Sequence, residues 1–314
     1  MLYDKAGYID VNFLRSFNCR YNIIVGARGT GKTYTSMLSA LENQIYSLYM
    51  RRKKEQIKLV LSPVLTPFKK FPEYQLKPKT ISEGFGYVES EKTNSIAFLC
   101  SAFLSMADLR GISVEDIQEM IFDEFIQEEH ERRAKKEYEI LRNAYETINR
   151  NRELEGREKL KCFLYGNSNT INSDILKGFN VIDDILNMQE KNIEVKKIET
   201  ADILLVSLHN SPIAIKKKNI DKLNSDLYSK TAYDNIFIDS NPKRIKYQML
   251  KEYILVVSIN DLHVYKHKSK KQLYISNIKV GGCPTYNVYT DQRNIRNKYL
   301  YLWRYYLDEK KKKK

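Results

Sequence analysis

Residues 26–33 read Gly-Ala-Arg-Gly-Thr-Gly-Lys-Thr, and no other feature of this chain constrains its fold as strongly. Residues 21–25 before them are apolar and partly β-branched, which predicts a buried strand. Residues 34–42 after them contain no Gly or Pro, which favours a helix. A strand, a loop of the form G-x-x-x-x-G-K-T and a helix, in this order, make a phosphate-binding P-loop. The sequence therefore predicts an α/β domain that binds a nucleoside triphosphate.

Each part of the loop has a chemical role. Glycines let backbone N–H groups turn inward around phosphate oxygens, and the following helix adds its positive N-terminal dipole. Lys32 is expected to reach the β- and γ-phosphates, and the Thr33 hydroxyl is expected to hold Mg²⁺. The residues expected to contact ATP are Gly26, Ala27, Arg28, Gly29, Thr30, Gly31, Lys32, Thr33 and Tyr34.

A short apolar run over residues 120–125 contains two adjacent acids and has the form of a Walker B strand. Asp123 would bind Mg²⁺, directly or through water, and Glu124 would polarise the attacking water. Apolar runs that end in acids are common, so this assignment depends on the P-loop upstream. Asn167 follows another apolar run, residues 161–165, and is expected to contact the γ-phosphate or the water as a sensor.

The charge of the chain points to a class of partner. Lys and Arg total 53 against 39 Asp and Glu, so the 314-residue chain carries a formal net charge of +14. A polyanionic partner explains this excess, because Lys and Arg that neutralise phosphates release condensed counterions. A Lys-rich surface without such a partner is the alternative.

The sequence also bears on the compartment. The four cysteines lie far apart and form no C-x-x-C pair, which argues against a zinc site or a disulfide framework: Cys19, Cys100, Cys162 and Cys283. No apolar run approaches the length of a membrane span, and the first residues do not have the pattern of a signal peptide. We expect a reducing cytosol and no membrane partner.

Strand and helix patterns alternate up to about residue 190, which predicts a doubly wound, mostly parallel sheet. Residues 85–90 and 95–100 flank a four-residue turn and predict a hairpin. Later strand patterns cover 194–199, 203–208, 236–238, 253–259 and 272–276, and a helical pattern covers 291–307. We expect a P-loop ATPase domain over 1–195, a linker over 196–230 and a smaller α+β domain over 231–314.

Four short segments in the first 170 residues resemble one family. They are residues 24–34 around the P-loop, Tyr49–Arg52, Ile121–Ile126 and Arg150–Glu153. The Gly-Ala-Arg-Gly loop and the Phe-Asp-Glu-Phe-Ile strand are more specific than generic P-loop motifs. With them, the chain resembles the genome-packaging ATPases of small tailed phages that carry protein-primed linear double-stranded DNA. The rest of the chain is only weakly similar in sequence, although its length and domain order agree.

The resemblance implies an additional-strand, RecA-like ATPase that forms a ring, usually a pentamer, on a procapsid portal. Such a translocase hydrolyses ATP between subunits and drives double-stranded viral DNA through a central pore. An arginine matching Arg150 enters the neighbour's ATP site, where its guanidinium stabilises charge on the γ-phosphoryl group. Arg152 is close enough to be this finger instead, and solvated arginines at a helix end are the alternative for both. Arg51 and Arg52 match a family arginine pair near the nucleotide.

The resemblance also implies a fold for the second domain. In larger relatives it is an RNase H-like nuclease that cuts DNA with clustered carboxylates and two metals. A protein-primed genome of unit length needs no cutting. We therefore expect a vestigial nuclease fold that binds nucleic acid or the portal without cleaving DNA. Its candidate carboxylates are Asp239, Asp261 and Asp291.

The partners implied by the resemblance are double-stranded DNA, further copies of the chain and the procapsid portal, with a structural RNA as an additional candidate. The implied location is the host cytoplasm. Lys92, Arg110 and the basic stretch 51–58 are candidates for the DNA pore. The alternative function is a replication or helicase-loading P-loop ATPase that acts on single-stranded DNA. A nucleotide-dependent switch with slow turnover is a third hypothesis, and the Glu124 carboxylate next to Asp123 argues against it.

Overall fold

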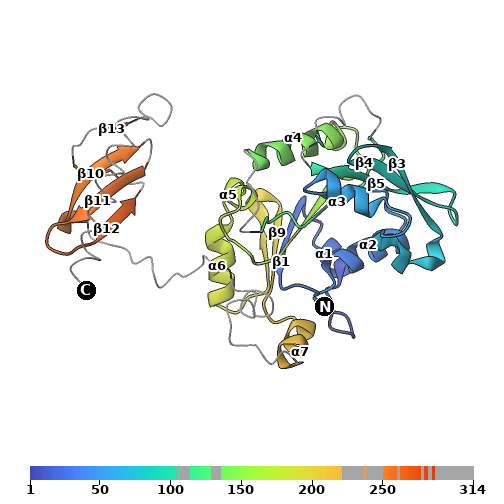
Figure 1. Ribbon diagram of the computed structural model, residues 1–314, viewed down its shortest axis with the longest axis horizontal. Helices are drawn as coiled ribbons and strands as arrows, with labels where there is room; N and C mark the ends of the chain where they lie inside the picture. Colours follow the sequence, from blue (N-terminus) through green and yellow to red (C-terminus); the bar gives the residue numbers. More distant parts are fainter. Residues whose placement is uncertain are drawn as a thin grey trace. The chain divides into compact units, whose positions relative to one another are not determined.

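The computed structural model divides the chain into two compact units, Met1–Ser240 and Asn241–Lys314, and each is described by itself (Figure 1). The structure describes residues 1–103, 105–106, 114–128, 136–220, 237, 250–259, 262–276, 279–281 and 285–286. Several sequence-based assignments lie outside these residues: Arg110, Asp239, Asp261, Cys283, Asp291 and the helical pattern over 291–307. Among the described residues, no helix is both long and apolar enough to cross a lipid bilayer.

The first unit is built on one nine-stranded sheet. Its strands are β1 Tyr21–Gly26, β2 Ser47–Arg51, β3 Leu76–Ser82, β4 Phe85–Ser90, β5 Ser95–Ala102, β6 Glu119–Asp123, β7 Lys161–Gly166, β8 Val195–Ile198 and β9 Ile203–Leu208. Its helices are α1 Val11–Arg15, α2 Lys32–Glu42, α3 Lys54–Val60, α4 Glu137–Asn149, α5 Asp174–Gly178, α6 Ile182–Glu190 and α7 Pro212–Ile220. Two 3₁₀ turns, η1 Pro67–Lys70 and η2 Pro72–Tyr74, precede β3.

The strand order is β3-β4-β5-β2-β6-β7-β1-β9-β8. The six strands from β5 to β9 in this order are parallel, and β4, β3 and β8 extend the edges antiparallel. The doubly wound, mostly parallel sheet expected from the sequence is therefore confirmed. Strand β7 lies between β1, which leads into the P-loop, and β6, which ends in Asp123. This order is the additional-strand arrangement that the resemblance implies.

The central strands are buried on both faces, as parallel strands between helices must be. Alternate residues enter two separate hydrophobic cores: Ile23 and Val25 of β1 pack in one, whereas Ile24 packs in the other. The first core includes apolar residues of α4, α5 and α6, and the second includes those of α1, α2 and α3. Figure 1 shows these two helix groups on opposite sides of the sheet. The layers fix where the strand ends, and hence the polar motifs, lie.

One region differs from the sequence-based domain boundaries. Residues 195–208, expected at the junction of the ATPase domain and the linker, form β8 and β9, and β9 pairs with β1 along its whole length. The first unit accordingly continues to Ser240. The reason is that β1 needs a second parallel neighbour to satisfy its backbone hydrogen bonds. The expected hairpin is confirmed as β4 and β5.

The stretch before this hairpin contains Pro63, Pro67, Pro72 and Pro78, and its regular elements are short. Residues 54–60 form α3, and 76–82 form β3 even though Pro78 lies within it. Strand β3 is the outermost strand of the sheet, where a residue without an N–H donor is tolerated. Proline therefore limited the length and position of these elements without preventing them.

The second unit contains a four-stranded sheet in the order β12-β11-β10-β13. Its strands are β10 Tyr253–Ile259, β11 Leu262–His267, β12 Leu273–Ser276 and β13 Thr285–Tyr286. Strands β10, β11 and β12 are antiparallel neighbours, and β13 pairs parallel with β10. The strands expected over 253–259 and 272–276 are confirmed. Of the strand expected over 236–238, only Phe237 is described, and it packs in a core of the first unit.

Candidate nucleotide site

The P-loop, the acidic strand end and Asn167 meet at one cavity on the carboxyl edge of the large sheet. Parallel strands place their carboxyl ends at the same edge, which is where open α/β sheets bind ligands. The cavity has a volume of about 360 Å³ and is lined by residues 28–34, Asp123, Glu124 and Asn167. The other lining residues come from α2, from η1 and the residue after it, from the segment after β6 and from β7: Met37, Pro67, Lys70, Phe71, Glu128 and Tyr165.

The loop has the backbone geometry that phosphate binding requires. Gly29 and Gly31 have φ angles of 73° and 91°, in the left-handed region that glycine adopts without steric cost. Gly31 also caps helix α2, and a Cβ at this position would lie 2.9 Å from Tyr8 Cδ1. The free N–H groups of the first turn of α2 therefore face an anion site at the positive end of the helix dipole.

Lys32 lies beneath the loop and is only 8% exposed. Its Nζ donates hydrogen bonds to the carbonyl oxygens of Gly26, at 2.9 Å, and Ala27, at 2.7 Å. Burial lowers the pKa of this ammonium to about 7, against the opposing effect of the nearby Asp123 and Glu124 carboxylates. A phosphate oxygen would offer Nζ a charged acceptor, which favours the protonated form. The residues present thus fit a triphosphate.

Asp123 collects three hydrogen-bond donors on one oxygen. Its Oδ2 accepts from Thr33 Oγ1 at 2.8 Å, from Tyr49 Oη at 2.8 Å and from Arg51 Nη1 at 2.5 Å. The side chain is almost completely buried. A carboxylate and a hydroxyl oxygen at this separation are the hard ligands that Mg²⁺ prefers, so Thr33 and Asp123 fit the metal role expected for them.

Glu124 sits at a strained turn directly after β6. Its φ is 59°, in the left-handed region that is unfavourable for a residue with a side chain. The carboxylate lines the cavity, and its Oε2 accepts a hydrogen bond from Arg51 Nη2 at 2.6 Å. Burial raises the pKa of Glu124, and the neighbouring Arg51 guanidinium opposes this effect. The strained turn brings this side chain beside Asp123 instead of directing it to the other face of the sheet.

Arg51 joins the two acids, because its guanidinium bonds Asp123 and Glu124 at the same time. Its buried Nε has no hydrogen-bond partner among the described residues. Sequence reasoning placed Arg51 near the nucleotide but missed Tyr49, whose hydroxyl bonds Asp123 from the interior of β2. A tyrosine in an apolar strand carries no sequence signal that separates this role from ordinary packing.

Arg52, the other member of the arginine pair, does not line the cavity. Its guanidinium pairs with Glu137 at the start of α4 and donates to the Phe125 carbonyl at 2.8 Å and to Gln127 at 3.1 Å. The side chain is 8% exposed. Arg52 therefore links the segment after β6 to helix α4 and is separated from the nucleotide site by that segment. Arg51 is the last residue of β2 and Arg52 lies just beyond the strand, so the two neighbouring arginines take different environments.

The two finger candidates, which follow α4, also differ. The Arg150 guanidinium is 45% exposed; it pairs with Glu115 and donates to the Thr147 carbonyl at 3.2 Å. Arg152 is buried, donates to the carbonyls of Glu115 and Ile117, and has its pKa lowered by burial. Neither residue lines the nucleotide cavity of its own chain.

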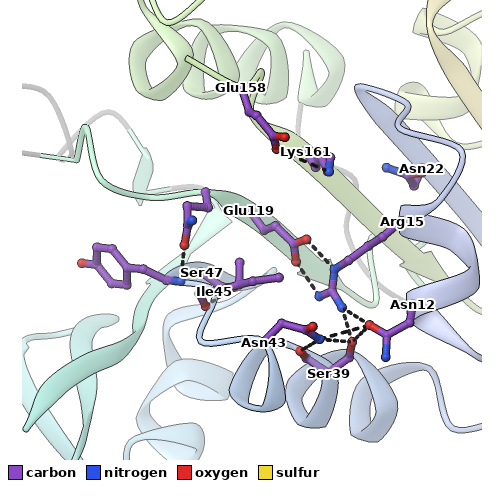
Figure 2. Close-up of polar contacts among 12 residues, drawn as sticks. Asn12, Arg15, Asn22, Ser39, Asn43, Ile45, Ser47, Glu119, Glu158 and Lys161 are labelled. Carbon is purple, nitrogen blue, oxygen red and sulfur yellow. Dashed lines mark hydrogen bonds and ion pairs between the residues drawn. The ribbon is translucent and has the colours of Figure 1, made fainter. Parts of the chain in front are cut away.

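The amino edge of the same sheet carries a different polar cluster, shown in Figure 2. Glu119, the first residue of β6, accepts two hydrogen bonds from Arg15, at 2.6 and 2.8 Å. Arg15 also bonds Asn12 at 3.0 Å and Ser39, so α1, α2 and β6 are joined at this point. A second cavity, of about 510 Å³, lies beside this cluster and is also lined by Lys159 and Lys161 at the amino end of β7.

Comparison with known proteins agrees with this fold. The DNA packaging protein of Bacillus phage phi29 is 25% identical over 198 residues, which are 58% of this chain and 56% of the relative. The chain thus spans little more than half the length of this relative. The crystal structure of the N-terminal domain of the phi29 DNA packaging ATPase matches 64% of this chain and 95% of that domain, at 20% identity and a TM-score of 0.51.

A second structural match covers more of the chain. A chain of the phi29 viral genome packaging motor assembly matches over 92% of this chain and 90% of its own length, at 17% identity and a TM-score of 0.61. At such identities, the structural matches establish the fold. The family model of the Podovirus DNA encapsidation protein (Gp16) matches residues 3–314, nearly the full length. The chain therefore belongs to the Podovirus DNA encapsidation protein (Gp16) family.

Proposed function

We propose that the chain is an ATP-driven translocase that packages double-stranded viral DNA into a procapsid. The observation that carries this proposal is the meeting of the P-loop, Asp123 and Glu124 at a single cavity. Membership of an encapsidation family and the phi29 relative, itself a DNA packaging protein, support DNA movement as the work performed. They favour this function over replication or helicase loading.

Each site residue has its own part in the proposed hydrolysis. Loop N–H groups and the Lys32 ammonium hold the β- and γ-phosphates. Thr33 and Asp123 would hold Mg²⁺, and the ion would supply positive charge beside the phosphate oxygens. Glu124 accepts a proton or hydrogen bond from the attacking water, and Asn167, at the end of β7, lies on the same cavity wall as a sensor.

Ring assembly is part of the proposal because the family resemblance implies that a neighbouring subunit completes each site. The described residues that line the cavity include Arg28, but this guanidinium pairs with Glu128 at the cavity wall. A neighbouring copy would supply Arg150 to stabilise charge on the γ-phosphoryl group. The Arg150 side chain is 45% exposed, so it is accessible to a neighbour. Arg152, bonded to two carbonyls, holds the loop that carries it. The pentameric ring, the portal and the structural RNA enter through the family resemblance.

The second unit is proposed to be an RNase H-like fold that binds nucleic acid or the portal and does not cut DNA. Three antiparallel strands with a fourth strand parallel to the first support such a fold. Within the described residues, no group of three or more His, Cys, Asp and Glu side chains could hold a metal ion.

Lys92 of the first unit, whose Nζ lies 5.2 Å from the Tyr74 ring centroid, remains a candidate for the DNA pore.

The test of the proposed function is the rate of ATP hydrolysis measured against protein concentration, with and without double-stranded DNA. A steep rise with concentration that DNA enhances is expected, because neighbouring subunits complete each site. A rate proportional to protein and indifferent to DNA would contradict a translocating ring.

A mixing experiment tests Arg150 directly. Arg150→Ala and Glu124→Gln should each be inactive alone, since each lacks one half of every site. In mixed rings, a Glu124 from one subunit meets an Arg150 from the next, so activity should return. No recovery on mixing, with both variants folded, would exclude Arg150 as the residue supplied in trans.

A further inference from the structure

We infer that Tyr34 and Phe71 form a stacking platform for the base of the bound nucleotide. This inference rests on the proposed function, because it takes the phosphates to lie at the P-loop. The cavity continues beyond the loop to a mainly apolar wall. The wall residues are Tyr34, Met37, Pro67, Lys70 and Phe71. A triphosphate anchored at Lys32 has this wall as an apolar surface on which its base can lie.

The two aromatic rings are arranged as a backed platform. Their centroids are 5.0 Å apart and their planes are inclined by 25°, so the rings are stacked. Phe71 is 1% exposed, whereas Tyr34 remains 42% exposed while lining the cavity. The buried ring thus supports one face of an accessible ring. An exposed aromatic that is held in this way loses little further freedom when a ligand stacks on it.

The platform is tied rigidly to the phosphate site. Tyr34 belongs to the first turn of α2, directly after Thr33 of the P-loop. Phe71 connects η1 and η2: its N–H donates to the Phe68 carbonyl at 3.1 Å, and its carbonyl accepts from Tyr74 N–H at 3.2 Å. Because neither ring sits on a long connection, the distance between the phosphate loop and the platform is set by the fold.

The chemistry of the wall favours recognition of the base by its face. Lys70 is the one charged side chain among these five residues, and none of them is an amide or a carboxylate that could read a base edge. Stacking of a base on an aromatic ring tolerates different bases, since each has a π-face. The site should therefore accept ATP and GTP with similar affinity and bind both better than pyrimidine triphosphates, whose bases are smaller.

A second tyrosine near the loop provides a matched control. Tyr8 is 38% exposed, close to the exposure of Tyr34, and packs against Gly31 from the other side of the P-loop. It does not line the cavity. If the base lay on that side instead, Tyr8 and not Tyr34 would contribute to binding.

The experiment is isothermal titration of the full chain with ATP, GTP and inorganic tripolyphosphate, in the presence of Mg²⁺. Tyr34→Ala should weaken ATP and GTP binding about tenfold or more and leave tripolyphosphate binding unchanged, because only the nucleotides carry a base. Tyr34→Phe should bind ATP as the parent does, and Tyr8→Ala should bind all three ligands as the parent does. Thermal unfolding of each variant shows whether it remains folded.

Three outcomes would overturn the platform. These are unchanged ATP affinity in Tyr34→Ala, equal weakening of ATP and tripolyphosphate, and a selective loss of ATP affinity in Tyr8→Ala. Failure of the proposed function gives a different result. If the P-loop held no triphosphate, the parent chain would bind neither ATP nor tripolyphosphate, and if the chain were no translocase, hydrolysis would be indifferent to DNA while the Tyr34 effect on ATP binding remained.

Discussion

The two ends of strand β6 carry buried acids that serve different purposes. At the amino end, Glu119 accepts hydrogen bonds from two of the three guanidinium nitrogens of Arg15, in a closed bidentate pair (Figure 2). At the carboxyl end, Asp123 is held by three separate side chains and borders the cavity beside Glu124. In the Arg15–Glu119 pair each charge is neutralised by the other, and the pair joins α1 to β6. Asp123 has several donors and borders a cavity, so it can exchange donors for a ligand.

The backbone beside the two acids differs as well. The carboxyl edge contains Gly29, Gly31 and Glu124 with positive φ angles, and Glu124 carries a side chain in that region. Such conformations persist only where the surrounding structure holds them, and they gather at functional sites. At the amino edge, Glu119 and Lys161 begin their strands with ordinary extended pairing to each other. The comparison predicts that substitutions at one edge alter ligand binding and turnover, and those at the other alter stability.

The largest effect is expected at the P-loop lysine. Lys32→Ala should bring triphosphate binding below detection, because it removes the one ammonium buried beneath the loop. The measurement is isothermal titration with ATP. Lys217→Ala is the matched control: its Nζ bonds the Gly29 carbonyl at 3.3 Å from outside the cavity, so binding should be close to that of the parent. Equal losses in both variants would indicate that general loop stability, and not a phosphate contact, is responsible.

Substitution of Glu124, the proposed general base, should affect turnover without affecting nucleotide binding. Glu124→Gln should reduce ATP turnover about 10²- to 10⁴-fold, the range for a lost general base, while ATP affinity is retained. The steady-state rate and the dissociation constant are measured on the same preparation. Glu128→Gln changes another carboxylate on the cavity wall, one that is paired with Arg28, and should affect turnover far less. Wild-type turnover in Glu124→Gln would remove this residue from the chemistry.

The amino edge should respond through stability. Glu119→Ala leaves the Arg15 guanidinium buried without its carboxylate, so the free energy of unfolding should fall by about 3–5 kcal/mol. Chemical denaturation measures it, and ATP affinity of the folded fraction should be unchanged. Glu158→Ala, at the same edge, breaks a 3.9 Å pair with Lys161 in which the acid is 88% exposed, and should cost almost nothing. A loss of ATP affinity in Glu119→Ala would contradict the prediction that the amino edge affects stability alone.

The smallest effect is a pH dependence specific to the carboxyl edge. The pKa of Lys32 is about 7 without a ligand, and an adjacent phosphate raises it because the anion favours the ammonium. Above pH 7, binding must therefore take up a proton, and the association constant should fall roughly tenfold per pH unit between pH 8 and 9. Titration in two buffers of different ionisation enthalpy measures the uptake directly. A flat affinity profile without proton uptake would mean that Lys32 is charged before the ligand arrives.

Much of the nucleotide site could be predicted because its parts are contiguous. The glycines, Lys32 and Thr33 lie within eight residues, and Asp123 and Glu124 are adjacent, so each group carries a recognisable spacing. Asn167 could be proposed because it follows directly after a strand. Predictions failed where proximity depended on strand order. Residues 195–208 were divided between a domain and a linker, although their pairing with β1 makes them part of the sheet.

The sequence by itself determined the strand–loop–helix of the P-loop, the acidic strand end and the arginine candidates, because each depends on a few consecutive residues and their local backbone preferences. The tertiary structure decided which groups each arginine contacts. Arg51 reaches Asp123 across 72 positions of sequence, while Arg52 turns to Glu137 and Arg152 is buried against Ile117. Such contacts follow from sheet order and from which face of a strand is covered. Local sequence carries no record of either, because both depend on segments far away in the chain.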